Sequence, residues 1–347
     1  MACVGIVSYR LLGTDGVSIE AEKWAWALGE LGAEVRRIAG AGPAGVQLVG
    51  GLGMAPEGAV DLDALDAALE PCDLVIVENL CSLPLNPAAG AAVAERLHGR
   101  PAIMRHHDLA WHRDDTSMMG PPPDDPGWRH VTISKMAAAE LKEHDIDATV
   151  IYNRFDLDPP QGARDETRSA MGIGCADRLL LQPTRALRRK NVPGGLALAE
   201  ALGAAYWLTA PAEDGYGDEL ADVLAAARVP VLRGQGPGSM HDVYAASDAV
   251  VLPSSWEGFG NPVVESIAQR RPLALGNYPV ASEIRAMGFA FFDPLEPAGL
   301  ESFLSSPDQS LLEENRVLAG AHFDIATLPA AIDDLLTSLS ISERDDQ

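Results

Sequence analysis

The stretch "DAVVLPSSWEGFGNPVVESIAQRRPLALGN", Asp248–Asn277, contains the pattern that decides the predicted fold. Its first apolar run is uninterrupted and bounded by polar residues, which predicts a buried central strand over 248–253. After a turn with two glycines, Asn261 and Pro262 predict a helix start, with Asn261 as the N-cap and Pro262 as the first helical residue. The run "RPLALG" then predicts the next strand. A strand, a helix and a further strand in this order indicate a parallel sheet covered by helices.

Short apolar runs alternate with helical patterns along the whole chain. "CVGIVSY", "DLVIVE", "PAIMRH", "HVTIS" and "ATVIYN" precede a polar, proline-bearing linker at 155–167, and "RLLLQPT", "AAYWLTA" and "VPVLRG" follow it. This rhythm predicts an α/β protein with two Rossmann-like, doubly wound domains. We place the first domain at 1–157 and the second at 158–324. A C-terminal helix at about 325–347 is expected to pack back on the first domain.

Composition limits the classes of function. The chain has 347 residues, 47% apolar and 22% charged, which suits a soluble globular protein with two domains. Its 26 Lys and Arg against 50 Asp and Glu give a net charge of −24, so we expect no nucleic-acid partner and no stable membrane binding. The N-terminus resembles a first strand and not a signal peptide, and no apolar run approaches about 18 residues. A cytoplasmic location is therefore expected.

Two glutamates stand eight residues apart, Glu257 before the predicted helix start and Glu265 within the helix. The backbone amides of residues 262–264 and the helix dipole would attract an anion at the carboxyl ends of the strands. Gly258 and Gly260 would let the backbone approach a ligand closely. Because carboxylates repel phosphate, the glutamates suit hydroxyl groups on either side of it. A nucleotide sugar has this layout, with Glu265 reaching the ribose and Glu257 reaching the transferred sugar.

The segment "SSWEGFGNPVVESIA" resembles the E-x7-E signature of the family 4 retaining glycosyltransferases, which have two Rossmann-like domains facing a cleft in the GT-B arrangement. Similarly, "QPTRALRRKN" resembles the family's basic loop, in which an arginine and a lysine five residues apart bind the donor pyrophosphate. The resemblance therefore implies catalytic roles for Glu257, Arg185 and Lys190. The donor-binding residues that it implies in the first segment are Glu257, Gly258, Phe259, Gly260, Asn261, Pro262, Val263, Val264 and Glu265.

The first domain resembles the family in two further places. "YRLLGTDGVSIEAEKW" reads as a strand, a glycine loop and a helix that starts near Ser18. The resemblance implies that the amides of Gly13 and Gly16 lie near the donor phosphate, and "DGVSIEAEKW" is similar to mannosylglucosylglycerate synthases. In "AIMRHHDLAWHR", the step from His107 to Asp108 resembles a His-Asp pair whose histidine reaches the donor sugar or its leaving phosphate, which adds His107 to the catalytic set.

The predicted function is retaining transfer of a hexose from a nucleotide diphosphate sugar, of the GDP-mannose or UDP-glucose type, to a hydroxyl of a small soluble polar acceptor. The family needs no bound metal, and the histidines fit no compact ligand set, so no cofactor and no metal are expected. Two alternatives stay open: a catalytically silent nucleotide-sugar-binding protein, and another GT-B enzyme such as a sugar-nucleotide epimerase or a phosphorylase. The sequence does not name the base, the sugar or the acceptor, and it leaves a homodimer open.

Overall fold

The chain divides into two compact units in a computed structural model that describes residues 2–55, 58–113, 116 and 119–345. The first unit comprises Met1–Arg154 and Ile325–Gln347, and the second comprises Phe155–Asp324. Residues 155–157, which the sequence analysis assigns to the first domain, lie in the second unit. The reason is that Phe155 pairs with Asp324 and donates its N–H to the carbonyl of Phe323 at 2.7 Å.

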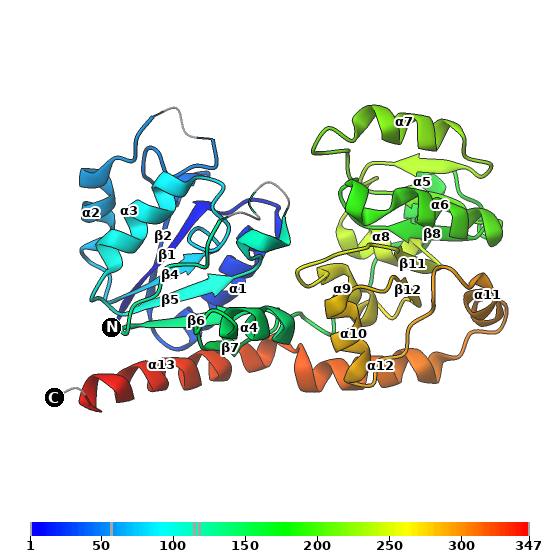
Figure 1. Cartoon of the computed structure of the whole chain (residues 1–347). Helices are drawn as coiled ribbons and strands as arrows, with labels where there is room; N and C mark the ends of the chain where they lie inside the picture. The colour runs from blue at the N-terminus through cyan, green and yellow to red at the C-terminus, as the bar shows by residue number, and fades with distance from the viewer. Residues whose placement is uncertain (1, 56–57, 114–115, 117–118, 346–347) are drawn as a thin grey trace. The chain divides into compact units, whose positions relative to one another are not determined.

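The first unit has a seven-stranded parallel sheet in the order β3-β2-β1-β4-β5-β6-β7. Its strands are β1 (Cys3–Arg10), β2 (Glu34–Ala41), β3 (Gln47–Leu48), β4 (Leu74–Glu78), β5 (Ala102–His106), β6 (Trp128–Thr132) and β7 (Ala148–Val150). Its helices are α1 (Gly16–Glu30), α2 (Leu62–Leu69), α3 (Pro87–Leu97), α4 (Lys135–Lys142) and α13 (Leu328–Asp345), with 3-10 turns η1 (Ala110–His112) and η3 (Ile325–Thr327) (Figure 1).

Alternating side chains of the strands build two cores, one on each face of this sheet. In β1, Val4 and Ile6 point into the core under α1 and α13, whereas Val7 points into the core under α2 and α3. This period of two is the strand geometry itself, since successive side chains leave opposite faces. α13 adds Leu328 and Ile332 to the first of these cores, so the C-terminal helix packs against α1 (Figure 1).

The second unit has a five-stranded parallel sheet in the order β10-β9-β8-β11-β12. Its strands are β8 (Leu179–Gln182), β9 (Ala205–Leu208), β10 (Val231–Arg233), β11 (Ala249–Leu252) and β12 (Leu273–Leu275). Its helices are α5 (Arg164–Ala170), α6 (Val192–Ala201), α7 (Gly217–Ala225), α8 (Met240–Ala246), α9 (Asn261–Ala268), α10 (Pro279–Ala286), α11 (Pro297–Ser305) and α12 (Gln309–His322), with the 3-10 turn η2 (Arg188–Lys190) (Figure 1). The α/β prediction is confirmed, because both sheets are wholly parallel and helix-covered.

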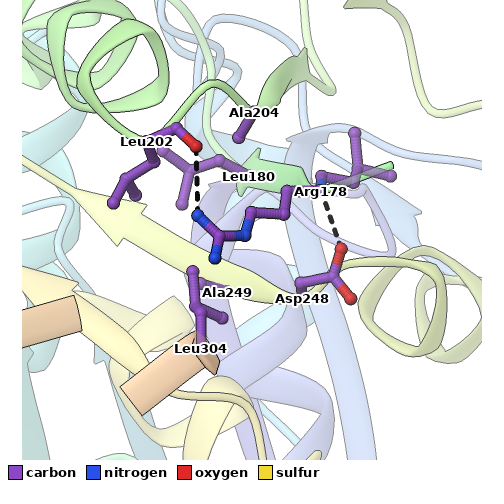
Figure 2. Close-up of a pocket in the computed structure, with 8 residues that line it drawn as sticks. Arg178, Leu180, Leu202, Ala204, Asp248, Ala249 and Leu304 are labelled. Atoms are coloured by element: carbon purple, nitrogen blue, oxygen red, sulfur yellow. Dashed lines mark hydrogen bonds between the residues drawn. The ribbon is translucent and has the colours of Figure 1, made fainter. Parts of the chain in front are cut away.

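A small hollow lies at the amino ends of β8 and β11, at the opposite end of the second sheet from the loops considered below. Arg178 spans it and donates to the carbonyl of Leu202 at 3.2 Å, while the N–H of Leu179 donates to Asp248 at 2.8 Å (Figure 2). The remaining lining is apolar and includes Leu180 and Leu304. The internal pairing of these polar groups indicates a structural role for this end of the sheet. Among the described residues, no helix is long and apolar enough to cross a membrane.

Candidate active site

Two loops of the second unit meet at the carboxyl edge of its sheet. β8 and β11 are adjacent parallel strands, so the segments that leave them emerge at the same edge. The first segment ends in η2, and the second contains Ser254 to Gly260. They touch directly, because the N–H of Ser255 donates to the carbonyl of Arg189 at 2.9 Å. The order of the sheet changes direction at β8, which is where open α/β sheets bind their ligands.

Glu257 is buried at this meeting point, with 6% of its surface exposed. The Lys190 ammonium donates to both carboxylate oxygens at 2.5 Å. Ser254 Oγ donates to Oε1 at 2.7 Å, and Arg189 Nη1 donates to Oε2 at 3.2 Å. The structure therefore brings together two of the predicted catalytic residues, Glu257 and Lys190, in a charge-assisted contact.

Lys190 is itself largely buried, and this burial lowers the pKa of its ammonium, although the Glu257 carboxylate opposes the shift. The charges of Arg189 and Arg185 lower the pKa further. Arg185 occupies a different position, since its Nη1 forms a half-exposed ion pair with Glu213 at 2.7 Å. The basic loop thus holds two cations, Lys190 and Arg189, against the Glu257 carboxylate and a third, Arg185, toward solvent.

The start of α9 differs from the prediction by one residue. Gly260 is the N-cap, Asn261 is the first helical residue and Pro262 is the second, so the assignment of Asn261 as N-cap is wrong. Gly260 takes a φ of +92°, a conformation that favours glycine and places its carbonyl to accept from the N–H of Val263 at 2.8 Å. Two members of the predicted amide set are wrong, because Pro262 has no N–H and the N–H of Val263 donates to the carbonyl of Gly260, whereas the role of the Val264 amide stays a prediction.

Glu265 lies one turn into α9 and is half-buried. Its Oε2 accepts a hydrogen bond from the phenol of Tyr244, on α8, at 2.7 Å. Burial, followed by the charge of Glu265, raises the pKa of Tyr244 well above its usual value, so this phenol stays a neutral donor. Glu265 therefore accepts a hydrogen bond from a neutral phenol, whereas Glu257 accepts hydrogen bonds from two cations.

Several predicted donor-binding residues have side chains that belong to the core. Phe259 is 3% exposed, with its ring centroid 6.3 Å from that of Phe155 and 5.7 Å from that of Phe323. Val263 and Val264 are fully buried. These three residues can offer a ligand only their backbone, and for Phe259 and Val264 that role stays a prediction.

The space beside Gly260 is limited by Tyr278. A Cβ on Gly260 would lie 2.7 Å from the Tyr278 hydroxyl, so a larger residue would require this neighbour to shift. Burial, and then the charge of Glu257, raise the pKa of Tyr278 well above its usual value. Gly258 precedes Phe259 and is half-buried in the same loop. The glycines thus allow a tight turn between Glu257 and α9.

The first unit contains the other predicted residues, Gly13, Gly16 and His107. Helix α1 begins at Gly16, two residues before the predicted start near Ser18, and Asp15 is its N-cap. The Asp15 carboxylate accepts from the N–H of Ser18 at 3.1 Å. A Cβ on Gly13 would lie 2.9 Å from the Asp15 carboxylate, whereas one on Gly16 would meet open space. A side chain at position 13 would therefore make the Asp15 carboxylate shift, whereas one at position 16 would not meet a neighbour.

His107 follows β5 and is 8% exposed. Its Nε2 lies 2.6 Å from Oε2 of Glu78, a fully buried carboxylate whose other oxygen accepts from Arg105 at 2.9 Å. Burial alone would raise the pKa of Glu78, but Arg105 and His107 outweigh it and lower the pKa. Asn79 completes the arrangement, because its side-chain oxygen accepts from the N–H of His107 at 3.0 Å. The imidazole is thus held by Glu78 at the end of β4, and the backbone of His107 is held by Asn79.

The sequence analysis missed the residues that orient the predicted ones, namely Arg189, Ser254, Tyr244 and Glu78. Arg189 precedes Lys190 in the basic loop, so the sequence shows its charge but not that its side chain contacts Glu257. Tyr244 lies in an apolar helical pattern and has no separate signal. Within the described part of the chain, no group of three or more His, Cys, Asp or Glu side chains is arranged to hold a metal ion.

A known protein family matches the part of the chain that contains Glu257 and Glu265. Residues 211–301 match the family model described as Glycosyl transferases group 1. This span runs from before α7 into α11 and includes both Glu257 and Glu265. Over these residues the chain is similar to the glycosyl transferases of group 1.

Two curated proteins and one solved structure extend this likeness beyond the matched domain. Mannosylglucosylglycerate synthase of Thermotoga maritima is 26% identical, across 90% of this chain and 89% of that protein. The synthase of the same name from Petrotoga mobilis is also 26% identical, across 82% of this chain and 85% of that protein. HepE of Anabaena, solved with UDP and glucose, has a TM-score of 0.75 at 16% identity, over 97% of this chain and 100% of that one. The structural likeness shows the GT-B type of fold, with two Rossmann-like units, and the family match over residues 211–301 supports glycosyl transfer as the kind of reaction.

Proposed function

We propose that this glycosyltransferase is of the retaining family 4 type and moves a hexose from a nucleotide diphosphate sugar to a hydroxyl of a small polar acceptor. The observation that carries the proposal is the pair of carboxylates on either side of the α9 start. Glu257 is held by Lys190 and Arg189, and Glu265 is held by Tyr244. Ionised carboxylates accept strong hydrogen bonds from hydroxyls, which the sugar and the ribose of such a donor supply at its two ends.

The diphosphate between those ends would take its countercharge from Lys190 and Arg185. Negative charge grows on the diphosphate as the bond to the anomeric carbon breaks, and fixed cations stabilise that charge before the reaction begins. The acceptor hydroxyl forms the new bond, and its proton passes to the leaving diphosphate. This route needs no protein nucleophile and no metal, and both features are part of the proposal.

The donor and acceptor are proposed from the relatives. Two proteins that align over most of this chain are named for synthesis of mannosylglucosylglycerate. That name contains a mannosyl group joined to the glycoside of a sugar acid. We therefore propose a GDP-mannose or UDP-glucose type of donor, and an acceptor of the sugar-acid glycoside class, such as glucosylglycerate.

Direct measurement of transfer tests the proposal. Purified protein is titrated by calorimetry with UDP, GDP and ADP, and then incubated with the matching sugar nucleotides and glucosylglycerate. We expect one nucleotide to bind, and NMR of the product to show the anomeric configuration of the donor. Binding without any turnover would indicate a silent nucleotide-sugar-binding protein, and an inverted anomeric centre would contradict the retaining assignment.

A further inference from the structure

Arg189 links the two loops that form the site in the second unit. Its Nη1 donates to the carbonyl of Trp256 at 3.2 Å and to Oε2 of Glu257 at 3.2 Å. Its own carbonyl accepts from the N–H of Ser255 at 2.9 Å and from the Ser255 hydroxyl at 3.3 Å. The guanidinium carbon lies 5.7 Å from the centre of the Trp256 ring. Three consecutive residues of the Glu257 loop are therefore attached to this one arginine.

The carboxylate of Glu257 is fully engaged in this arrangement. A carboxylate offers about four lone-pair positions. Two are used by the Lys190 ammonium, one by Ser254 Oγ and one by Arg189 Nη1. A sugar hydroxyl can bind Glu257 only if one of these donors moves away.

Lys190 is the donor best suited to move. Its ammonium is a compact charge on a flexible stem, and a diphosphate competes directly for it. Arg189 is constrained at the edge of its planar group by the bond to the Trp256 carbonyl, and the Trp256 ring lies near the guanidinium. A guanidinium held in this way retains its direction when the neighbouring lysine turns.

We infer that Arg189 is a positioning residue that holds the Glu257 carboxylate in place while Lys190 turns from Glu257 to the donor diphosphate. This inference rests on the proposed function. Arg189 then pairs with the carboxylate of Glu257, and Lys190, at the next position of η2, pairs with the diphosphate. Glu257 becomes free to accept a sugar hydroxyl, yet its orientation stays fixed.

A matched pair of variants tests this role. Arg189→Gln removes the charge that holds Glu257. Arg188→Gln is the control, since Arg188 lies in the same turn and bonds a carboxylate, Glu219, at 2.9 Å, with its guanidinium carbon 5.5 Å from the ring of Tyr216. For both variants, kcat and KM are measured with the accepted donor, and the Kd of the nucleotide diphosphate is measured by calorimetry.

We expect Arg189→Gln to lower kcat about tenfold and to change the nucleotide Kd less than about twofold, with Arg188→Gln unchanged in both. A tenfold weaker nucleotide Kd with kcat retained would show that Arg189 is a phosphate ligand and would overturn the inference. Unchanged kcat and Kd would overturn it as well.

A second substitution covers the case in which Arg189→Gln does not fold. Arg189→Lys keeps the charge but cannot bond the Trp256 carbonyl and Glu257 in one plane, so kcat should fall about threefold at unchanged Kd. Unchanged kcat in Arg189→Lys would contradict the inference. A wild-type protein that binds no nucleotide and transfers no sugar would instead contradict the proposed function, so the two failures are distinguishable.

Discussion

Glu257 and Glu265 stand eight residues apart in one motif, yet their surroundings differ in kind. Glu257 is buried and surrounded by the ammonium of Lys190, the guanidinium of Arg189 and the hydroxyl of Ser254. Glu265 is half-buried and accepts from the neutral phenol of Tyr244. The cations beside Glu257 belong to the loop that would also face a diphosphate, whereas the phenol beside Glu265 is far less responsive to charge. Under the proposed function, the cations beside Glu257 would respond to a bound diphosphate, whereas the phenol of Tyr244 gives Glu265 a donor that carries no charge.

Removing the Lys190 cation beside Glu257 should have the largest effect on stability. Lys190→Met leaves Glu257 buried with only part of its countercharge, and breaking such a pair is costly. We expect the free energy of unfolding of the second unit to fall by about 3 kcal/mol, together with weaker nucleotide binding. Chemical denaturation followed by fluorescence measures the first effect.

The matched control is Lys142→Met, because Lys142 pairs with Asp147 at an exposed position of the first unit. Screening by solvent makes such pairs nearly neutral for stability, so no measurable change is expected. An equally stable Lys190→Met protein would show that Glu257 does not depend on its cation and would remove the contrast between the two glutamates.

Removing the Tyr244 phenol beside Glu265 should have a smaller effect, and on nucleotide binding. Tyr244→Phe deletes the donor to Glu265 without changing the shape of the core. We expect the nucleotide diphosphate Kd to rise about fivefold, equivalent to about 1 kcal/mol, while kcat stays the same. Tyr9→Phe is the control, since it also removes a buried phenol, one that bonds the carbonyls of Leu83 and Leu80 and the N–H of Asn86 in the first unit. A drop in kcat with an unchanged Kd in Tyr244→Phe would contradict the separation of roles.

The smallest effect is expected from removal of divalent metal. If Lys190 and Arg185 meet the charge of the diphosphate, then EDTA should leave kcat and KM unchanged within about twofold. Activity is measured before and after chelation, with magnesium and manganese added back in turn. Complete loss of activity in EDTA, restored by either metal, would mean that Lys190 and Arg185 do not suffice to balance the charge of the diphosphate.

The sequence was sufficient for those parts of the molecule that follow from local patterns. The apolar run at Ala249–Leu252 and the following "RPLALG" predicted adjacent parallel strands, which β11 and β12 confirm. The spacing of Glu257 and Glu265 and the charge of Lys190 were also visible. The helix start was wrong by one residue, because Gly260 with its positive φ takes the N-cap position that an Asn-Pro step usually indicates for asparagine.

The partners of these residues could not be predicted, because they come from distant parts of the chain. Arg189 reaches Glu257 across 68 positions and Tyr244 reaches Glu265 across 21. The direction of an arginine on a short 3-10 turn depends on the neighbouring loop, and no local pattern encodes that contact. The two glutamates were therefore found from the sequence, but the difference between them required the structure.

The central claim is that Glu257 acts on the sugar and Glu265 holds the nucleotide, and the direct test is kinetics with calorimetry on Glu257→Gln and Glu265→Gln. Glu257→Gln should lower kcat by about 10²-fold, or about 2.7 kcal/mol, and leave the nucleotide diphosphate Kd within about twofold. Glu265→Gln should raise that Kd and the donor KM about tenfold and leave kcat nearly unchanged, as expected for uniform binding. If Glu257→Gln abolishes nucleotide binding while Glu265→Gln spares it, the assignment of the two ends is contradicted.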